Sequence, residues 1–310
     1  MSATARAEEM LRAAAGERVR TRVPLAALTT FRVGGPAELF LEAESDADLA
    51  AIGRAANEAG LPVLVLGKGS NVLVSDGGFS GIVLRLGKAF RWAAREGVEL
   101  VAGGAEPLPA LAGVALAHRL AGLEFGVAIP ASLGGAVRMN AGAHGRSMSD
   151  VLAGIEVFDL ALGSRRWMAP ADAGFSYRQS SLGDGAVVVG ARIGLEPGTR
   201  EEIRARMDEA RDWRRATQPL AQPNCGSVFT NPPGDHAARL VEAAGAKGLR
   251  VGGAEVSRKH ANFIVADPDA RAADVAALIR TVQARVTEAF GVTLETEVRL
   301  VGDFEAAATA

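Results

Sequence analysis

The chain has 310 residues, of which 48% are hydrophobic and 23% are charged, and its formal net charge is −2. This composition supplies enough apolar side chains for packed cores and excludes an intrinsically disordered chain. Because the charge is nearly balanced and no basic stripe stands out, we expect no nucleic-acid partner. The length predicts two or three domains.

The cysteine, the histidines and the hydropathy of the sequence indicate the cellular compartment of the protein and whether it has a metal site. A single cysteine, Cys225, cannot form an internal disulfide and fits a reducing compartment. The first twenty residues lack the apolar run of a signal peptide, and no stretch is long and apolar enough to insert into a membrane. We therefore expect a cytoplasmic protein. No metal is expected, because metal-ligand spacing is absent from the histidines His118, His144, His236 and His260.

Helix and strand patterns alternate through the first half. Ser45 and Asp48 resemble a capping box for a helix that Gly60 ends. Short apolar runs at 63–66, 72–74 and 82–84 predict strands. A further helix is expected over 108–121, with Gly122 as its stop.

The second half continues with strands expected at 155–160 and 187–195. Thr199 and Glu202 form a capping box before a helical stripe of Ile203, Met207, Ala210 and Trp213. The proline-containing stretch 217–223 reads as a domain linker.

A last helix shows one apolar face, made by Val275, Leu278, Ile279, Val282, Val286 and Phe290, and Gly291 closes it. In the strand expected next, Val292, Leu294, Val298 and Leu300 point one way, and Thr293, Glu295, Glu297 and Arg299 point the other. We expect the final residues, 305–310, to be frayed.

Two glycine-rich segments have the character of ligand-binding backbone. The loop Gly67, Lys68, Gly69, Ser70 and Asn71 follows a strand, and its exposed N–H groups could cradle phosphates, although a tight turn without a ligand is equally compatible. The loop is neither a Rossmann fingerprint nor a P-loop. Residues 130–136 and 139–143 form a second patch with few side chains for a core. Two such segments favour a dinucleotide site, and a long surface loop is the alternative.

Three distant segments carry residues suited to acid, base and cation chemistry. Ser227 lies in a bend between two prolines, and Glu295 and Glu297 share one side of the last strand. Tyr177, the only tyrosine, precedes Arg178, whose guanidinium can bind a carboxylate or phosphate through two hydrogen bonds. Each residue also has an ordinary structural interpretation, namely a solvent-facing polar side or a surface arginine. For Cys225, a buried inert thiol is favoured over a nucleophile.

In their order and separation, these motifs resemble the UDP-N-acetylenolpyruvoylglucosamine reductase family, in its shorter type II branch. The resemblance rests on residues 30–35, 67–71, 130–136, 139–142, 177–181, 223–232, 259–264 and 294–299. It implies an α+β chain with a two-subdomain FAD-binding fold of the vanillyl-alcohol-oxidase type and a C-terminal α/β substrate-binding domain. The expected boundaries are 1–88 and 89–216 for the FAD-binding subdomains and 217–310 for the substrate domain.

The resemblance also implies site residues. Non-covalent FAD is expected at Arg32, Gly67, Lys68, Gly69, Ser70, Asn71, Val72, Pro130, Ala131, Ser132, Gly134, Gly135, Ala136, Asn140 and Gly142. Tyr177, Asn224 and Asn231 are expected to hold the UDP-sugar substrate. Thr230 and Lys68 depart from the residues often found at their positions in the family. We therefore expect the contacts of these two side chains with their ligands to differ in detail, while the reaction stays the same.

The implied reaction uses NADPH and FAD to reduce the enolpyruvyl ether of UDP-N-acetylglucosamine enolpyruvate to UDP-N-acetylmuramate. Arg178 would stabilise charge on the substrate carboxylate, Glu297 would orient that group, and Ser227 would donate a proton. A monomer is implied. The alternatives are another FAD oxidoreductase of the same fold with a different substrate, or a flavin-binding protein without catalysis.

Overall fold

The computed structural model describes residues 2–304, so the predicted frayed tail at 305–310 lies outside the described residues. The chain divides into two compact units. The first comprises the chain up to Thr21 together with Glu38–Lys68 and Gly81–Arg214, and the second comprises Arg22–Ala37, Gly69–Ser80 and the chain from Arg215 onward. No helix within residues 2–304 has the length and apolar character needed to cross a membrane.

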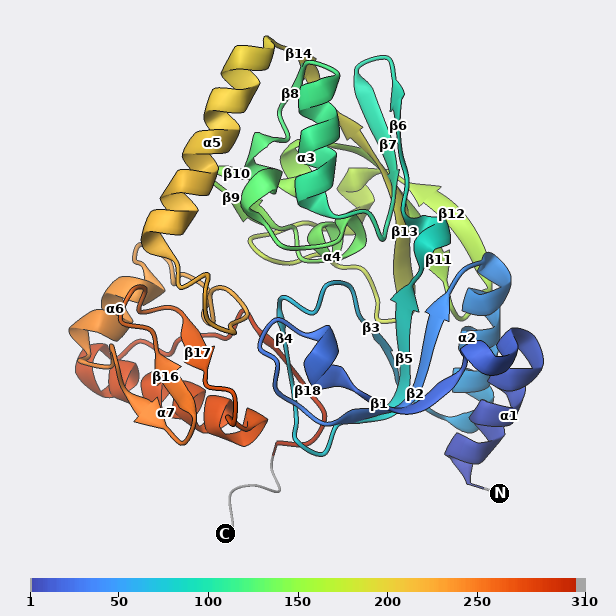
Figure 1. Cartoon of the computed structure of the whole chain (residues 1–310), viewed down its shortest axis with the longest axis horizontal. Coiled ribbons are helices and arrows are strands. Elements are labelled where there is room, and N and C mark those ends of the chain that lie inside the picture. Colours follow the sequence, from blue (N-terminus) through green and yellow to red (C-terminus); the bar gives the residue numbers. More distant parts are fainter. Residues whose placement is uncertain (1, 305–310) are drawn as a thin grey trace. The chain divides into compact units, whose positions relative to one another are not determined.

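Two sheets lie largely in the first unit (Figure 1). One has the order β1-β2-β5-β3 and is formed by β1 (Arg20–Pro24), β2 (Pro36–Ala43), β5 (Phe79–Leu86) and β3 (Val63–Val65). Helices α1 (Ala3–Ala15) and α2 (Asp46–Ala59) lie side by side, and their apolar faces share a core with this sheet. Ser45 caps α2 by accepting from the Asp48 N–H, and Gly60 ends it in a left-handed conformation, as the sequence predicts.

The second sheet of this unit is antiparallel, in the order β12-β11-β13-β7-β6. Its strands are β12 (Ser164–Met168), β11 (Leu152–Asp159), β13 (Ala186–Gly194), β7 (Glu99–Gly103) and β6 (Ala93–Glu96). Helices α3 (Leu108–Ala117) and α4 (Leu133–Arg138) share one hydrophobic core with it. Two short pairs, β8 (Leu120–Ala121) with β14 (Glu196–Pro197) and β9 (Gly142–Ala143) with β10 (Arg146–Ser147), complete its strands.

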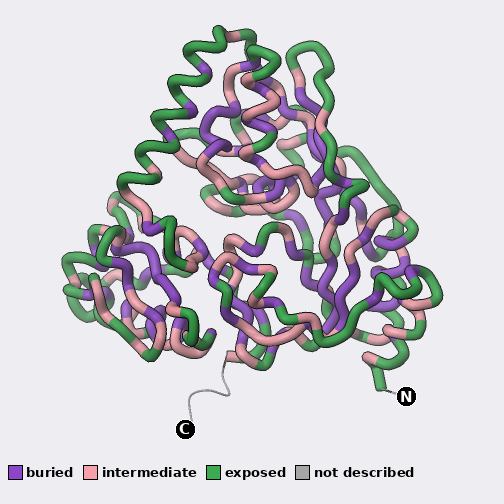
Figure 2. The backbone as a smooth tube through the Cα atoms, viewed as in Figure 1, coloured by how far each residue is buried: buried purple, intermediate pink, exposed green. Residues whose placement is uncertain are grey.

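Helix α5 (Arg200–Thr217) follows the Thr199–Glu202 capping interaction predicted from the sequence. Figure 2 shows α5 largely exposed, and its buried residues are Ile203, Met207 and Ala210. Trp213 was predicted to extend this stripe, and that prediction is wrong, because its side chain is 49% exposed. It instead makes an edge-on contact with the ring of His144, with 5.2 Å between ring centroids.

The second unit contains the parallel pair β4 (Val72–Val74) and β18 (Arg299–Val301), and the antiparallel sheet β15 (Arg250–Val251), β16 (Ala254–Val256) and β17 (Ile264–Ala266). Helices α6 (Ala237–Ala243) and α7 (Ala272–Phe290) pack into the same core. Asp76, after β4, accepts from the Ala272 and Ala273 N–H groups at 2.8 and 3.0 Å and so caps the start of α7.

Short 3-10 turns elsewhere in the chain span Gly16–Arg18, Leu25–Leu28, Lys88–Phe90, Glu124–Ala128, Met148–Asp150 and Pro170–Ala173.

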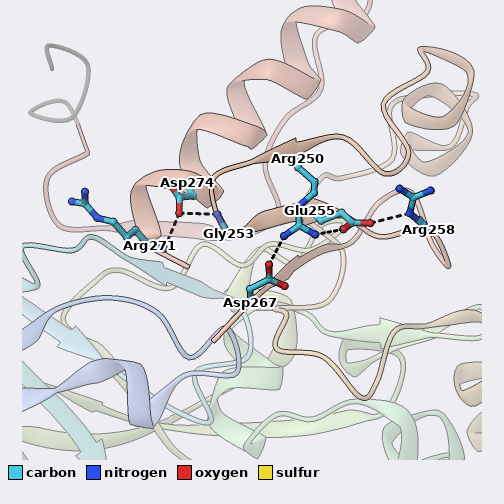
Figure 3. A network of polar contacts seen from close by, with 7 residues as sticks. All are labelled: Arg250, Gly253, Glu255, Arg258, Asp267, Arg271 and Asp274. Atoms are coloured by element: carbon cyan, nitrogen blue, oxygen red, sulfur yellow. Dashed lines mark hydrogen bonds and ion pairs between the residues drawn. The ribbon is translucent and has the colours of Figure 1, made fainter. Parts of the chain in front are cut away.

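A polar network holds the edge of the three-stranded sheet to the start of α7 (Figure 3). Arg250 pairs with Glu255 on the neighbouring strand and with Asp267 just after β17. Asp274 in the first turn of α7 accepts from the Gly253 N–H at 3.1 Å and from the Arg271 N–H at 3.0 Å. The carboxylates of this network form ion pairs with arginines or accept hydrogen bonds from backbone N–H groups. The network therefore has a structural role.

Two predicted elements differ from the structure. The helix expected over 108–121 ends at Ala117, because Arg119 adopts a left-handed φ of 56° and the next two residues pair with β14. The long final strand is also wrong, since only Arg299–Val301 is strand. The N–H groups of Glu297 and Val298 both donate to the Val228 carbonyl, at 2.8 and 3.4 Å.

The predicted alternation holds as far as Leu294 and Val298, which are buried, and fails in β18. Leu300 is 42% exposed, whereas Val301 is buried. Phe290, expected on the apolar face of α7, is 40% exposed at the end of the helix. The remaining residues predicted for that face are buried, as the structure of α7 shows.

Candidate active site

The loop between β3 and β4 presents a row of free backbone donors. Within residues 2–304, the N–H groups of residues 67–71 donate to no protein acceptor. Gly69 adopts a φ of 64°, and a Cβ atom there would lie 2.2 Å from the Leu28 carbonyl oxygen, so only glycine fits. Successive unpaired N–H groups around a left-handed residue form a concave anion site.

Charge in the first unit also suits an anion beside this loop. Burial lowers the pKa of Lys68, and the positive charges of Arg85 and Arg91 lower it further, against an opposing effect of Glu106. A lysine whose protonated form is disfavoured by its surroundings gains from an added negative charge. Burial and the two arginines thus leave Lys68 suited to pair with a negatively charged group.

The glycine-rich patch packs closely against the start of that loop. Ser132 caps α4 by accepting from the Gly135 N–H at 3.3 Å. A Cβ atom at Gly67 would lie 2.6 Å from the Ser132 hydroxyl, and one at Gly134 would lie 2.8 Å from the Val188 carbonyl. The N–H groups of Leu133, Gly134 and Gly135 are bonded within the protein, so the free donors are those of the loop 67–71. A row of such donors fits the pyrophosphate of a dinucleotide such as the FAD expected from the sequence.

Other residues expected at the FAD site lie in or next to these segments. Pro130, Ala131 and Ala136 flank the capping serine, and Val72 opens β4 directly after the loop. The Asn71 side chain donates to the Glu297 carbonyl at 3.0 Å. Arg32 has a φ of 58° and is exposed between the buried residues Phe31 and Val33.

Arg178 occupies a strained turn. Its φ is 59°, an uncommon value for a residue with a side chain, and strain of this kind concentrates at functional sites. Its guanidinium donates to the Gly142 carbonyl at 2.8 Å and lies 5.0 Å from the centre of the Tyr177 ring. Tyr177 is itself 53% exposed. These contacts fix the direction of the guanidinium.

Asn140 supports the same turn through its side chain. It is buried and has a φ of 41°. Its amide nitrogen donates to the Ser176 carbonyl at 3.0 Å, and its amide oxygen accepts from the Ser149 N–H at 2.9 Å. The side chain of Asn140 thus ties the Arg178 turn to the chain after β10.

Ser227 and Glu297 come from distant parts of the sequence and meet through the backbone of the second unit. The Glu297 N–H donates to the carbonyl of Val228, the residue after Ser227, at 2.8 Å. Phe229 and Thr296 form an isolated antiparallel bridge in the same register. The Ser227 hydroxyl has no hydrogen-bond partner in the described chain. It is therefore available to a ligand.

The two asparagines expected at the substrate site make local contacts. The Asn224 amide oxygen accepts from the Gly226 N–H at 2.9 Å, and its nitrogen donates to the carbonyls of Pro219 and Gln222. Asn231 accepts from the Ala237 N–H at 3.0 Å, at the start of α6. Both side chains shape the turns around Ser227.

Cys225 is buried, as predicted. Burial is the main cause that raises the pKa of its thiol well above the usual range, and the negative charge of Glu297 adds to the effect. The thiolate form is strongly disfavoured, so Cys225 is not a nucleophile. No cluster of histidine, cysteine and acidic side chains suited to a metal ion occurs within residues 2–304.

The structure thus places Ser227 and Glu297 together in one unit, with Asn71 joined to Glu297. Arg178 belongs to the other unit, so its meeting with those two residues stays a prediction. Sequence reasoning assigned no role to Asn262, although its side chain makes two hydrogen bonds to Phe229, two residues after Ser227.

Comparison with known proteins decides the family. Residues 218–301 match the model for the C-terminal domain of UDP-N-acetylenolpyruvoylglucosamine reductase, and residues 37–169 match an FAD-binding domain. A reductase of that name from Anaeromyxobacter sp. (strain Fw109-5) is 48% identical over 299 residues, which is 96% of this chain and 93% of the relative. The chain belongs to the UDP-N-acetylenolpyruvoylglucosamine reductase family.

The solved structures agree with this membership. The reductase of this family from Thermus caldophilus superposes with a TM-score of 0.80 at 38% identity, over 92% of this chain and 99% of that one. Phl p 4.0202, a glucose dehydrogenase, shares the fold alone, with a TM-score of 0.50 and 11% identity over 67% of this chain and 49% of its own.

The predicted fold class is therefore confirmed: an FAD-binding fold of the vanillyl-alcohol-oxidase type with a C-terminal domain of this reductase family. The protein is accordingly an FAD-dependent oxidoreductase. The three-part division at 88/89 and 216/217 stays a prediction.

Proposed function

We propose that the protein reduces the enolpyruvyl ether of UDP-N-acetylglucosamine enolpyruvate to UDP-N-acetylmuramate at the expense of NADPH, in the synthesis of peptidoglycan precursors. The observation that carries this proposal is the pairing of the Ser227 segment with the Glu297 segment, together with a Ser227 hydroxyl that has no hydrogen-bond partner within residues 2–304. Membership of the reductase family supports the same reaction.

The residues expected to hold FAD are those of the glycine-rich loop and patch. The free N–H groups of residues 67–71 would bind the pyrophosphate, and the backbone around Ser132 and Gly134 would lie against it. Residues Arg32, Asn140 and Gly142 complete this set. Bound FAD would supply a two-electron carrier between NADPH and the enolpyruvyl double bond.

Arg178 would bind the substrate carboxylate and stabilise the negative charge that develops there as the double bond is reduced. Its guanidinium is already oriented by the Gly142 carbonyl and the Tyr177 ring, so little reorganisation is required. Loss of one such donor costs roughly 3–4 kcal/mol of transition-state stabilisation. Glu297 would orient the same carboxylate and, being next to an anion, would be protonated or tightly paired there.

Ser227 would donate the proton that completes the reduction. A hydroxyl is a weak acid in water, but one held beside a strongly basic carbon can transfer its proton. Tyr177, Asn224 and Asn231 would hold the UDP-sugar around this group. NADPH would use the same site in turn, so a second nucleotide motif is unnecessary. The proposal includes a monomeric protein in the cytoplasm.

An assay of NADPH oxidation tests this function. The purified protein should release FAD on denaturation and should oxidise NADPH rapidly with UDP-N-acetylglucosamine enolpyruvate, with UDP-N-acetylmuramate identified by mass spectrometry. UDP-N-acetylglucosamine, which lacks the enolpyruvyl group, is the control and should leave NADPH unchanged. A flavin that NADPH reduces but the enolpyruvate does not reoxidise would favour a different substrate. A folded protein free of flavin would contradict the proposal as a whole.

A further inference from the structure

Asn262 lies in the turn between β16 and β17 and is almost completely buried, with 4% of its surface exposed. Its amide oxygen accepts from the Phe229 N–H at 2.9 Å, and its amide nitrogen donates to the Phe229 carbonyl at 2.8 Å. Its own backbone carbonyl accepts from the Val228 N–H at 2.9 Å. Three hydrogen bonds from one residue therefore fix the two residues that follow Ser227.

The opposite side of the same segment is held by the segment of Glu297. The Val228 carbonyl accepts from the Glu297 N–H at 2.8 Å, and Phe229 is bridged to Thr296. The segment after Ser227 is thus clamped between Asn262 and the segment that ends in β18. The two residues after Ser227 are therefore bonded on one side to Asn262 and on the other to the segment of Glu297.

Only an amide side chain satisfies both groups of Phe229. A carboxylate would accept from the N–H but would place a second oxygen against the Phe229 carbonyl, and an aliphatic side chain would leave both buried backbone groups unpaired. His260 assists, because its Nδ1 accepts from the Asn262 N–H at 3.2 Å and so fixes the backbone of the turn.

We propose that Asn262 is a positioning residue for the proton donor Ser227: by pairing both backbone groups of Phe229 it holds the hydroxyl at the reacting carbon of the substrate. This inference rests on the proposed function. Asn262 acts through Ser227 and does not contact the substrate. Its removal should therefore slow proton delivery while leaving reduction of the bound flavin by NADPH unchanged.

A double-mutant cycle tests this role. Wild type, Asn262→Ala, Ser227→Ala and the double variant are reduced with NADPH without oxygen and mixed with UDP-N-acetylglucosamine enolpyruvate, and flavin reoxidation is followed. Because a displacement of about 1 Å costs about 10²-fold, Asn262→Ala should slow reoxidation by about that factor in the wild-type background. In the Ser227→Ala background the same change should have an effect within about twofold.

Equal slowing by Asn262→Ala in both backgrounds would overturn the proposal, since a general structural defect does not depend on the Ser227 hydroxyl. Ser75→Ala is the matched control, because Ser75 is also buried in the second unit and donates to the Gly78 carbonyl at 3.0 Å. It should leave reoxidation within about twofold of wild type.

If Asn262→Ala does not fold, Asn262→Asp replaces it in the same cycle. It keeps the acceptor for the Phe229 N–H and loses the donor to the carbonyl, so it should slow reoxidation in the wild-type background alone. Equal slowing in both backgrounds again overturns the proposal. Wild-type protein that the enolpyruvate fails to reoxidise would instead refute the proposed function, so the two failures are distinguishable.

Discussion

The Glu297 N–H donates to the Val228 carbonyl at 2.8 Å, and this bond joins the segments of Ser227 and Glu297, which lie seventy positions apart in the sequence. The proposed proton donor and a carboxyl group thus come from segments that are bonded to each other.

Replacing Ser227 with alanine should separate the two halves of the reaction. NADPH should reduce the flavin at the wild-type rate, whereas substrate reduction should slow by about 10²–10⁴-fold because the proton donor is lost. Rapid mixing without oxygen measures each half separately. Ser75→Ala, a buried serine in the same unit, should leave both rates unchanged. Equal slowing of the two halves in Ser227→Ala would show that the hydroxyl has another role.

Replacing Arg178 with alanine should slow substrate reduction by about 10²–10³-fold, because the developing charge loses its donor. Arg178→Lys should recover only part of the rate, since an ammonium group lacks the planar fork of arginine. Arg146→Ala, an exposed arginine on β10 of the same unit, is the control. Unchanged single-turnover reoxidation of the flavin in Arg178→Ala would refute this role.

The two acidic residues near the end of the chain should differ in their effects. Glu297 is half-buried beside the Ser227 segment, whereas Glu295 is exposed and contributes its backbone carbonyl to the Thr230 N–H at 3.0 Å. We expect Glu297→Gln to lower kcat by about 10²-fold or more, the lower limit for such groups. Glu295→Gln should stay within about twofold of wild type. If Glu295→Gln lowered kcat more than Glu297→Gln did, Glu295 would be the acidic residue that acts on the substrate.

Cys225 should resist alkylation in the folded protein. Its raised pKa, caused mainly by burial, keeps the thiol protonated at pH 8, and the thiolate is the reactive form. Iodoacetamide should modify it only after unfolding, as intact-mass measurement would report. Modification of the native protein within minutes would contradict the buried thiol described above.

Acid should weaken the first unit through Asp48. Burial opposes ionisation of this carboxyl. Two hydrogen bonds from the Arg18 guanidinium, both 2.7 Å long, outweigh burial together with those of the Glu44 N–H and the Ser45 side chain, so the pKa of Asp48 is lowered. A lowered folded-state pKa stabilises the protein above about pH 3.9, the usual value for aspartate, and this stabilisation is lost as pH falls through the folded-state pKa.

Asp48→Asn should therefore destabilise the protein at pH 7 by about 1–3 kcal/mol, measured by urea unfolding. The difference from wild type should shrink below about pH 4. Asp46→Asn in the same helix turn is the control, since its carboxylate is more exposed and pairs with Arg165 at the surface. A difference that persists unchanged in acid would exclude the ion pair as its cause.

The sequence predicted the ends of a helix correctly where one short motif determines them. Ser45 and Gly60 bound α2 because a cap needs only the residue and its neighbours. The helix stop at Gly122 was misplaced because Arg119 adopts a left-handed φ, which no local rule requires of an arginine.

In residues 292–301 the alternation of apolar and polar residues does not predict the structure. Strict alternation placed Leu300 inside, but only Arg299–Val301 is strand, and the backbone partner of Glu297 and Val298 is Val228, far away in the chain. The role of Asn262 was missed for the same reason. A buried asparagine gives no periodic signal, and its partner Phe229 lies 33 positions away.

The central claim is that Ser227, Arg178 and Glu297 act on one substrate, and a crystal structure with FAD and UDP-N-acetylglucosamine enolpyruvate tests it most directly. The Ser227 hydroxyl should lie within about 3.2 Å of the carbon it protonates or of one bridging water, with Arg178 and Glu297 at hydrogen-bond distance from the substrate carboxylate. A substrate bound beside the flavin with any of these three side chains turned away would contradict the account.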